Sequence, residues 1–330
     1  MLHKETAASP GRRAAALAGL RRYQHALRPT PRAPKPAIAA AGRARLLDYG
    51  GSGMPIVFVP SLINPPLVLD LARGNSLLRW LSRQGVRPML VDWGTPSPTD
   101  RGMDITAHVE RLLLPMLRNL ARPPILVGYC LGGTLAIAAA SAIRVSGLVT
   151  IAAPWRFAGY GDAVGPAVQL WERVRAASEQ LGLMPMEVLQ AGFWQLDPAS
   201  TVAKFERFGR LPPASATARA FVALEDWANE GAPLTLGAAS QLFGDFFTRD
   251  LPGTGGWQVE GRAVDPRALA CPSLAFVSST DRIAPASSAP PADTIFETTL
   301  GHVGMVVGSR ARAALWQPLA DWLSAVAQPR

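Results

Sequence analysis

Cysteine, histidine and long apolar runs are all scarce in this 330-residue chain. Its two cysteines, Cys130 and Cys271, are too few for the disulfide framework of a small secreted protein. No apolar run approaches the ~20 residues that a membrane-spanning helix requires. The short apolar stretch at residues 14–20 is followed by Arg21 and Arg22, which is a poor match to a signal peptide. These absences favour a reduced, cytoplasmic protein without a transmembrane segment.

Metal and nucleotide signatures are also missing. The chain has no zinc-ligand spacing, no phosphate-binding glycine loop and no dinucleotide fingerprint. We therefore predict no metal, no resident cofactor and no nucleic-acid partner.

The net charge of +9 is concentrated at the N-terminus. Residues 1–47 hold ten Lys and Arg against one acidic residue, while the rest of the chain holds 23 of each sign. Four prolines interrupt this segment between residues 29 and 36. Residues 1–45 are therefore predicted to be a disordered or extended arm with one short helix over residues 12–27. The arm is either a solvated tail or a segment weakly attracted to an anionic surface.

Strand and helix patterns alternate from residue 46 onward. Strands are expected at residues 55–59, 88–92, 125–128, 147–152, 274–278 and 294–298, and helices at residues 76–84 and 106–120, the latter kinked at Pro115. This alternation predicts an α/β fold with a mostly parallel sheet covered by helices on both faces.

The alternation stops between residues 155 and 265, where a helical pattern dominates. Eight of the eleven phenylalanines lie there, among them Phe193, Phe205, Phe221, Phe243, Phe246 and Phe247. We predict a helical cap at 155–265 inserted into a core formed by 46–154 and 266–330. Most of these aromatic residues should form the core of the cap, and a few would line an apolar acyl tunnel that excludes water.

Cys130 occupies the centre of the string VGYCLGG at residues 127–133, between an expected strand and an alanine-rich helix. This is the G-x-nucleophile-x-G pattern of a nucleophile elbow, with glycines at 128 and 132 that let strand and helix approach closely. The N–H of Leu131 would lie at the helix N-terminus, where free donors can stabilise an oxyanion. The alternative interpretation is a buried small apolar side chain in a strand-to-helix turn.

The other members of a catalytic triad follow in the expected chain order. Asp281 stands after the strand at residues 274–278, and His302 lies in the string LGHVG after the next strand. The other three histidines fit less well, because His3 and His25 lie in the arm and His108 falls in a helix. We therefore predict a triad of Cys130, Asp281 and His302, and a structural role for Cys271.

These motifs resemble those of polyhydroxyalkanoate synthases, especially the class III catalytic subunits. The similar segments are VPSLIN at 59–64 with LDL at 69–71, VDWGTP at 91–96, GYCLGGTL at 128–135, DRIAP at 281–285 and GHVG at 301–304. The resemblance runs from about Arg45 to the C-terminus and is weakest in the cap. The sequence Pro65-Pro66-Leu67 departs from the family, which usually has a basic or aromatic residue there.

The resemblance implies an α/β-hydrolase fold with Cys130 as the acyl-carrying nucleophile, His302 as general base and Asp281 as its partner. The N–H groups of Leu131 and of Leu62, in the Ser61–Leu62 turn, would face the oxyanion. Substrates would be (R)-3-hydroxyacyl-CoA thioesters, polymerised into polyhydroxyalkanoate with release of CoA. An accessory synthase subunit, a homodimer and a polyester granule surface are the partners it implies.

Two other functions stay open from the sequence. The same triad could serve a thioesterase, esterase or lactone hydrolase, since some hydrolases of this fold also use cysteine. A non-catalytic granule-associated or scaffold protein could also have kept the fold.

Overall fold

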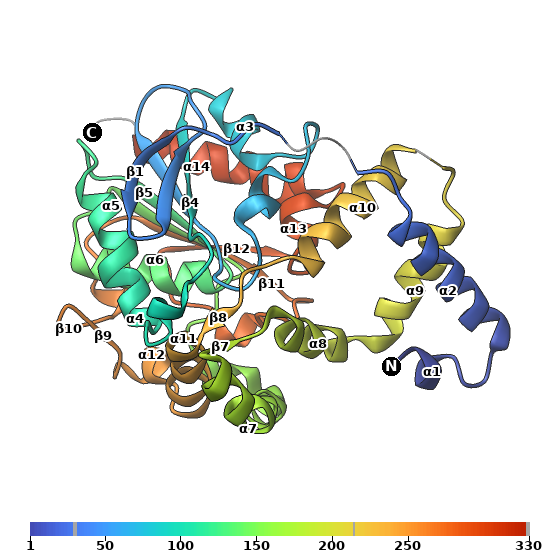
Figure 1. Cartoon of the computed structure of the whole chain (residues 1–330). Helices are drawn as coiled ribbons and strands as arrows, with labels where there is room; N and C mark the ends of the chain where they lie inside the picture. The colour runs from blue at the N-terminus through green and yellow to red at the C-terminus, as the bar shows by residue number, and fades with distance from the viewer. Residues whose placement is uncertain (29–31, 214, 328–330) are drawn as a thin grey trace.

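The computed structural model describes residues 1–28, 32–213 and 215–327. Across these residues the main sheet has eight strands in the order β1-β2-β4-β3-β5-β6-β11-β12 (Figure 1). Antiparallel pairing joins β1 to β2 and β2 to β4, and the other neighbours are parallel. The strands are β1 (Ala37–Ala41), β2 (Ala44–Asp48), β3 (Pro55–Val59), β4 (Arg87–Asp92), β5 (Ile125–Tyr129), β6 (Gly147–Ile151), β11 (Ser273–Ser278) and β12 (Thr294–Thr298).

Helices cover both faces of this sheet, and alternate residues of β3 show the division. Val57 and Val59 belong to an apolar cluster shared with α6 (Leu131–Ala142), whereas Ile56 and Phe58 face the cluster shared with α3 (Leu77–Ser82) and α14 (Gln317–Ala327). Successive strand residues point to opposite faces, so a strand buried on both sides is apolar throughout. The predicted α/β fold with a mostly parallel, doubly covered sheet is confirmed.

The remaining core helices are short. They are η1 (Pro66–Asp70), η2 (Pro98–Asp100), α4 (Ile105–Ala107), η3 (His108–Leu113), α5 (Leu114–Arg118), η6 (Pro266–Ala268), η7 (Ala286–Ser288), α13 (Gly304–Val307) and η8 (Arg312–Trp316). The helix expected at residues 106–120 is broken into α4, the π-helical η3 and α5, with Pro115 in the first turn of α5. Proline lacks the N–H of a regular helical turn, which accounts for irregularity at this point.

Between β6 and β11 the chain forms a mainly helical insertion. Its elements are η4 (Phe157–Ala163), α7 (Val164–Leu181), β7 (Leu183–Met184), α8 (Met186–Leu196), α9 (Pro198–Gly209), α10 (Ala216–Asn229), β8 (Leu234–Thr235), α11 (Leu236–Ser240), η5 (Gln241–Thr248), α12 (Leu251–Thr254), β9 (Gln258–Val259) and β10 (Arg262–Ala263). Many of its aromatic rings contact one another, for example Trp171 stacked on Phe243 and Phe157 edge-on to Phe247. We refer to this insertion as the cap.

The N-terminal segment contains the helix predicted for residues 12–27, but it is otherwise more ordered than the predicted arm. It forms α1 (Leu2–Glu5) and α2 (Pro10–Gln24), and α2 packs along α9 on the side of the molecule away from the sheet (Figure 1). Gly19 allows this contact, because a Cβ on it would lie 1.9 Å from the Phe205 carbonyl oxygen. The sheet also starts earlier than predicted, since β1 lies within residues 1–45. Prolines 29, 31 and 34 separate the helical part from the sheet, and residues 29–31 lie outside the described residues.

Among the described residues, no helix combines the length and the apolar character needed to cross a membrane.

Candidate active site

The turn between β5 and α6 holds Cys130 in a backbone conformation that L-residues rarely adopt. Its φ and ψ angles are 56° and −134°, and its side chain is half-buried at the N-cap position of α6. Such strain persists only where the surroundings enforce it, and it clusters at functional sites. A strand, a sharp turn and a helix therefore surround the thiol, as the elbow pattern predicts.

Glycines on both sides of Cys130 make this turn sterically feasible. A Cβ on Gly128 would lie 2.3 Å from the Gly133 Cα, and a Cβ on Gly132 would lie 2.1 Å from the Val59 carbonyl oxygen. Both distances are shorter than any ordinary van der Waals contact. The sequence therefore needs glycine here for close packing of α6 against β3 and β5.

The loops after β11 and β12 bring the predicted acid and base together. His302 Nδ1 and Asp281 Oδ2 lie 2.6 Å apart, and both side chains are buried. The other carboxylate oxygen, Oδ1, accepts the backbone N–H groups of Ile283 at 2.8 Å and Ala284 at 3.0 Å. These bonds fix the carboxylate, which in turn fixes the imidazole with its Nε2 free to face another group.

Electrostatics connect this imidazole to Cys130. Burial alone would lower the pKa of His302, but the negative charge of the Cys130 thiolate and hydrogen bonds to Asp281 and Cys130 raise it to about 10. An opposite charge close by favours the protonated ring. The imidazole is therefore held by a carboxylate and lies close to the candidate cysteine nucleophile, as a general base would.

The loop from Pro60 to Pro65, between β3 and η1, lies against the elbow. The Trp93 indole N–H donates to the Pro60 carbonyl at 3.0 Å, and the Ser61 hydroxyl accepts the Ile63 N–H at 3.2 Å. A Cβ on Gly132 would meet the Pro60 carbonyl at 2.5 Å, so this loop and the start of α6 are in close contact. Leu62 is buried in this loop and Leu131 is the first residue of α6, whose N–H has no partner within the helix.

The remaining histidines lie elsewhere. His108 is buried beneath Trp93, with Nε2 2.6 Å from Arg43 Nη2 and Nδ1 2.6 Å from the Asp104 carbonyl oxygen. Burial, with a contribution from the Arg43 charge, lowers the pKa of His108 to about 4. His3 lies in α1 and His25 caps α2. Cys271 is half-buried, and burial and the Asp293 charge raise its pKa, which opposes thiolate formation.

Sequence reasoning did not single out Tyr160, a partly buried cap residue whose pKa responds to the charges of Cys130 and Asp281. Its ring stacks on Phe157 and contacts Phe247 edge-on at 5.0 Å. Burial, followed by the negative charges of Cys130 and Asp281, raises the pKa of Tyr160 well above its ordinary value. Tyr160 lies in no recognisable motif, so only the folded arrangement of cap and core reveals it.

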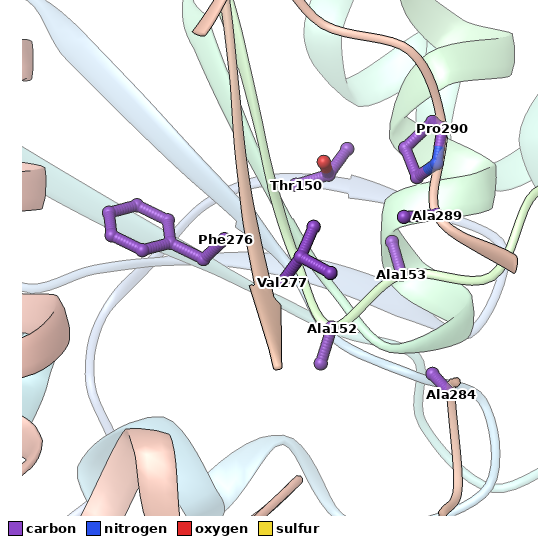
Figure 2. Close-up of a pocket in the computed structure, with 8 residues that line it drawn as sticks. All are labelled: Thr150, Ala152, Ala153, Phe276, Val277, Ala284, Ala289 and Pro290. Carbon is purple, nitrogen blue, oxygen red and sulfur yellow. The ribbon is translucent and has the colours of Figure 1, made fainter. Parts of the chain in front are cut away.

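A shallow depression lies beside the acid loop (Figure 2). In Figure 2 the ring of Phe276 points away from the other lining side chains. The cavity is lined by Thr150, Ala152, Ala153, Phe276, Val277, Ala284, Ala289 and Pro290. None of Cys130, Asp281 and His302 is among these residues. This depression therefore adjoins the acid loop through Ala284, whose N–H binds Asp281, but it does not include the three triad residues.

Comparison with known proteins defines the class to which this fold and site belong. The family model described as "Alpha/beta hydrolase family" matches residues 56–317. The chain therefore belongs to the α/β-hydrolase family.

Within that class, the curated relatives that match most of the chain share one description. The chain is 27% identical over 317 residues to the poly(3-hydroxyalkanoate) polymerase subunit PhaC of Haloferax mediterranei, covering 88% of this chain and 64% of that protein. It is 24% identical over 314 residues to the subunit of the same name from Allochromatium vinosum, with 88% of both chains covered. These similarities confirm the predicted membership of the polyhydroxyalkanoate synthase family. The chain spans about two-thirds, 64%, of the length of the first two haloarchaeal relatives.

Solved structures show a similar fold at low identity. An epoxide hydrolase from Bacillus megaterium has a TM-score of 0.56 at 13% identity, covering 88% of this chain and 99% of that one. A monoacylglycerol lipase from Paleococcus ferrophilus has a TM-score of 0.51 at 14% identity, covering 86% and 99%. At these identities the similarity concerns the fold alone.

Proposed function

We propose that this protein is an acyltransferase that polymerises (R)-3-hydroxyacyl-CoA into a polyhydroxyalkanoate through a Cys130–His302–Asp281 triad. The observation that carries the proposal is a cysteine elbow coupled to a carboxylate-held imidazole, in a chain similar to polyhydroxyalkanoate polymerase subunits.

Acylation begins with proton transfer from the Cys130 thiol to Nε2 of His302. Asp281 holds Nδ1–H and stabilises the imidazolium that forms. The thiolate sulfur attacks the thioester carbonyl carbon, and the carbonyl π pair moves to oxygen opposite the N–H groups of Leu131 and Leu62. As the oxyanion collapses, the carbon–sulfur bond to CoA breaks and the imidazolium protonates the departing CoA thiolate.

Chain growth then uses the acyl group on Cys130. His302 takes the proton from the hydroxyl of a second monomer or of the growing chain, and the oxygen attacks the Cys130 thioester. A carbon–oxygen bond forms, the carbon–sulfur bond to Cys130 breaks, and the proton passes to the thiolate. Sulfur suits this role because exchange of one thioester for another keeps the acyl group activated until the oxyester forms.

The remaining assignments belong to the same proposal. Acyl-CoA is the substrate, and the reaction requires no metal or resident cofactor. The chain would work in the cytoplasm at a polyester granule surface, with an accessory synthase subunit or as a homodimer.

Incubation of the purified protein with 3-hydroxybutyryl-CoA tests the function directly, with Cys130→Ala as the control. Insoluble polyester and released CoA from the wild type, and neither from Cys130→Ala, are expected. CoA together with free 3-hydroxybutyrate would identify a hydrolase that uses the same triad. If the wild type neither releases CoA nor becomes acylated, with or without an accessory subunit, the synthase assignment is wrong for this substrate.

A further inference from the structure

The cap contacts the loop that is proposed to stabilise the oxyanion, and it does so at three consecutive residues. The Trp227 indole N–H donates to the Pro65 carbonyl at 2.8 Å. The Asn64 side-chain amide reaches the Glu230 carbonyl at 3.5 Å. Gly231 lies so close to the loop that a Cβ on it would be 2.6 Å from the Ile63 carbonyl oxygen. The end of α10 and the residues after it therefore fit against residues 63–65.

A second tryptophan holds the same loop at its other end. Trp93, directly after β4, donates its indole N–H to the Pro60 carbonyl at 3.0 Å. Pro60 and Pro65 bracket Leu62, so the two indoles fix the two ends of the segment that carries the proposed oxyanion donor. Trp93 belongs to the core, whereas Trp227 belongs to the cap.

Trp227 is itself firmly placed. Its side chain is 8% exposed and packs in the same apolar cluster as Val68 and Leu69 of η1. The adjacent Ala228 carbonyl accepts the Gln190 side-chain amide of α8 at 3.2 Å. Two cap helices therefore determine where the Trp227 indole lies.

We propose that Trp227 is a positioning residue for acyl transfer: it holds the Pro60–Pro65 loop so that the Leu62 N–H faces the oxyanion, and it couples the cap to the chemistry. This proposal rests on the proposed function. An oxyanion donor works only when it is preorganised near the position that the charged oxygen will occupy. The Trp227 indole N–H bonds to the Pro65 carbonyl rather than to a triad residue, so its effect passes through the loop.

Two reactions of Cys130 separate this role from a general structural one. Acylation by a thioester or ester forms an oxyanion, whereas alkylation by iodoacetamide does not, although both require the thiolate and His302. Loss of loop positioning should therefore slow acylation without changing alkylation. A 3-hydroxybutyryl-CoA donor and a generic donor, p-nitrophenyl butyrate, are both used, because oxyanion stabilisation applies to either.

Trp227→Phe retains most of the ring volume and removes the N–H. Since removal of a direct oxyanion donor costs ~100-fold or more, we expect loss of a residue that supports one to slow maximal acylation on the order of 10-fold. The half-saturating donor concentration and the alkylation rate should stay within about two-fold of wild type, as expected for a group that acts in the transition state. Gly231→Ala, which pushes on Ile63 from the cap side, should show the same selective loss.

Trp257→Phe is the matched control. It removes a buried indole hydrogen bond of the same length, 2.8 Å, but this bond is to Thr106, away from the loop. The control should change neither rate. Three results would overturn the positioning role. Trp227→Phe could lose acylation and alkylation equally, or it could acylate at the wild-type rate. Trp257→Phe could also slow acylation as much as Trp227→Phe does.

The two proposals fail in different ways. If p-nitrophenyl butyrate acylates Cys130 but 3-hydroxybutyryl-CoA does not, the substrate assignment fails, and the selective loss with the generic donor still supports Trp227. If neither donor acylates Cys130 in the wild type, both proposals are wrong.

Discussion

At Gly132 the absence of a side chain lets the backbone of α6 lie directly against β3. A Cβ at this position would lie 2.1 Å from the Val59 carbonyl oxygen and 2.5 Å from that of Pro60. Both neighbours are backbone atoms, which cannot rotate away as a flexible side chain can. The constraint at this residue is therefore steric, and it acts on the elbow and on the proposed oxyanion loop together.

Gly132→Ala should lower the free energy of unfolding by about 1–3 kcal/mol, the usual cost of overpacking. Chemical denaturation provides the measurement. Gly165→Ala in α7 is the control, because nothing lies within 4 Å of the position its Cβ would take. Alanine there should be neutral or stabilising by up to about 1 kcal/mol. Equal stability of the two variants would contradict the packing argument.

Asp281→Asn should lower the pKa of His302 from its present value of about 10, because the charged hydrogen-bond partner of Nδ1 is lost. Histidine NMR signals followed against pH measure this shift. The acylation rate should also fall on the order of a thousandfold, since an amide partner can hold the wrong tautomer.

Asp293→Asn serves as the control for this substitution. Asp293 is exposed and binds Ser273, so both the His302 pKa and acylation should match wild type. An unchanged His302 pKa in Asp281→Asn would refute the assigned partnership.

His108 makes a pH-dependent contribution to stability whose direction follows from its pKa. The folded-state pKa is about 4 against an ordinary value of 6.5, so the unfolded chain binds this proton first as the pH falls. The resulting destabilisation is absent above pH 6.5, grows as pH drops towards 4, and reaches on the order of 3 kcal/mol. His108→Asn removes the titrating group. Between pH 6.5 and 4 the variant should therefore lose less of its free energy of unfolding than the wild type does. Parallel stability curves for the two proteins would contradict the low pKa.

At the scale of elements, the contact between α2 and α9 depends on charge as well as close packing. The Arg22 guanidinium donates to the carbonyls of Phe208 at 3.2 Å, Gly209 at 3.1 Å and Leu211 at 2.6 Å. These carbonyls lie at or just beyond the C-terminal end of α9, where helix carbonyls lack partners and a cation is favoured. The guanidinium also lies 4.9 Å from the centre of the Phe208 ring.

Arg22→Gln should therefore weaken attachment of α2, by about 2 kcal/mol for the loss of charged hydrogen bonds. Limited proteolysis within residues 1–28 would measure the effect as faster cleavage. Arg21→Gln is the matched control, because Arg21 is an exposed neighbour on the same helix. Equal cleavage rates for the two variants would show that Arg22 does not hold the helix.

Local patterns predict some elements well. The expected strands at residues 55–59 and 294–298 match β3 and β12, because β-branched and aromatic residues dominate both. Strand β1 was not predicted, because its sequence, AIAAA, has little β-propensity. The strand pairs with β2 across a tight turn. The α2–α9 contact joins residues almost 200 positions apart, and no local pattern encodes it.

At the scale of the whole molecule, some residues of the candidate site can be predicted from the sequence and others cannot. The elbow and the order of Cys130, Asp281 and His302 are visible in the sequence because each lies at a strand end, and parallel strands bring their carboxyl ends to one edge. The contributions of Tyr160 and Trp227 are not visible, because the cap positions them through long-range contacts. The sequence therefore named the core residues of the site one by one, whereas for the cap it predicted only that a few aromatic residues line a tunnel.

The arm completes a chain of contacts that leads from the N-terminus to the proposed oxyanion loop. Tyr23 of α2 donates to Asp226 of α10 at 2.8 Å and packs with Phe205 and Phe221. Asp226 directly precedes Trp227, which holds the loop at Pro65. The arm supports α9 and α10 through a small apolar cluster that is separate from the two clusters on the sheet.

Deletion of residues 1–28 should therefore expose that small cluster and speed proteolysis within α9 and α10. Acylation should slow in the same direction as in Trp227→Phe, and alkylation of Cys130 should stay unchanged, because the triad is anchored in the core. Arg12→Gln is the control: it removes one partly exposed ion pair to Glu206, worth ~1 kcal/mol or less, and leaves α2 and its contact with Asp226 in place. If the deletion leaves proteolysis and acylation at wild-type rates, α9 and α10 hold their positions without the arm, and the basic segment has no part in placing the loop.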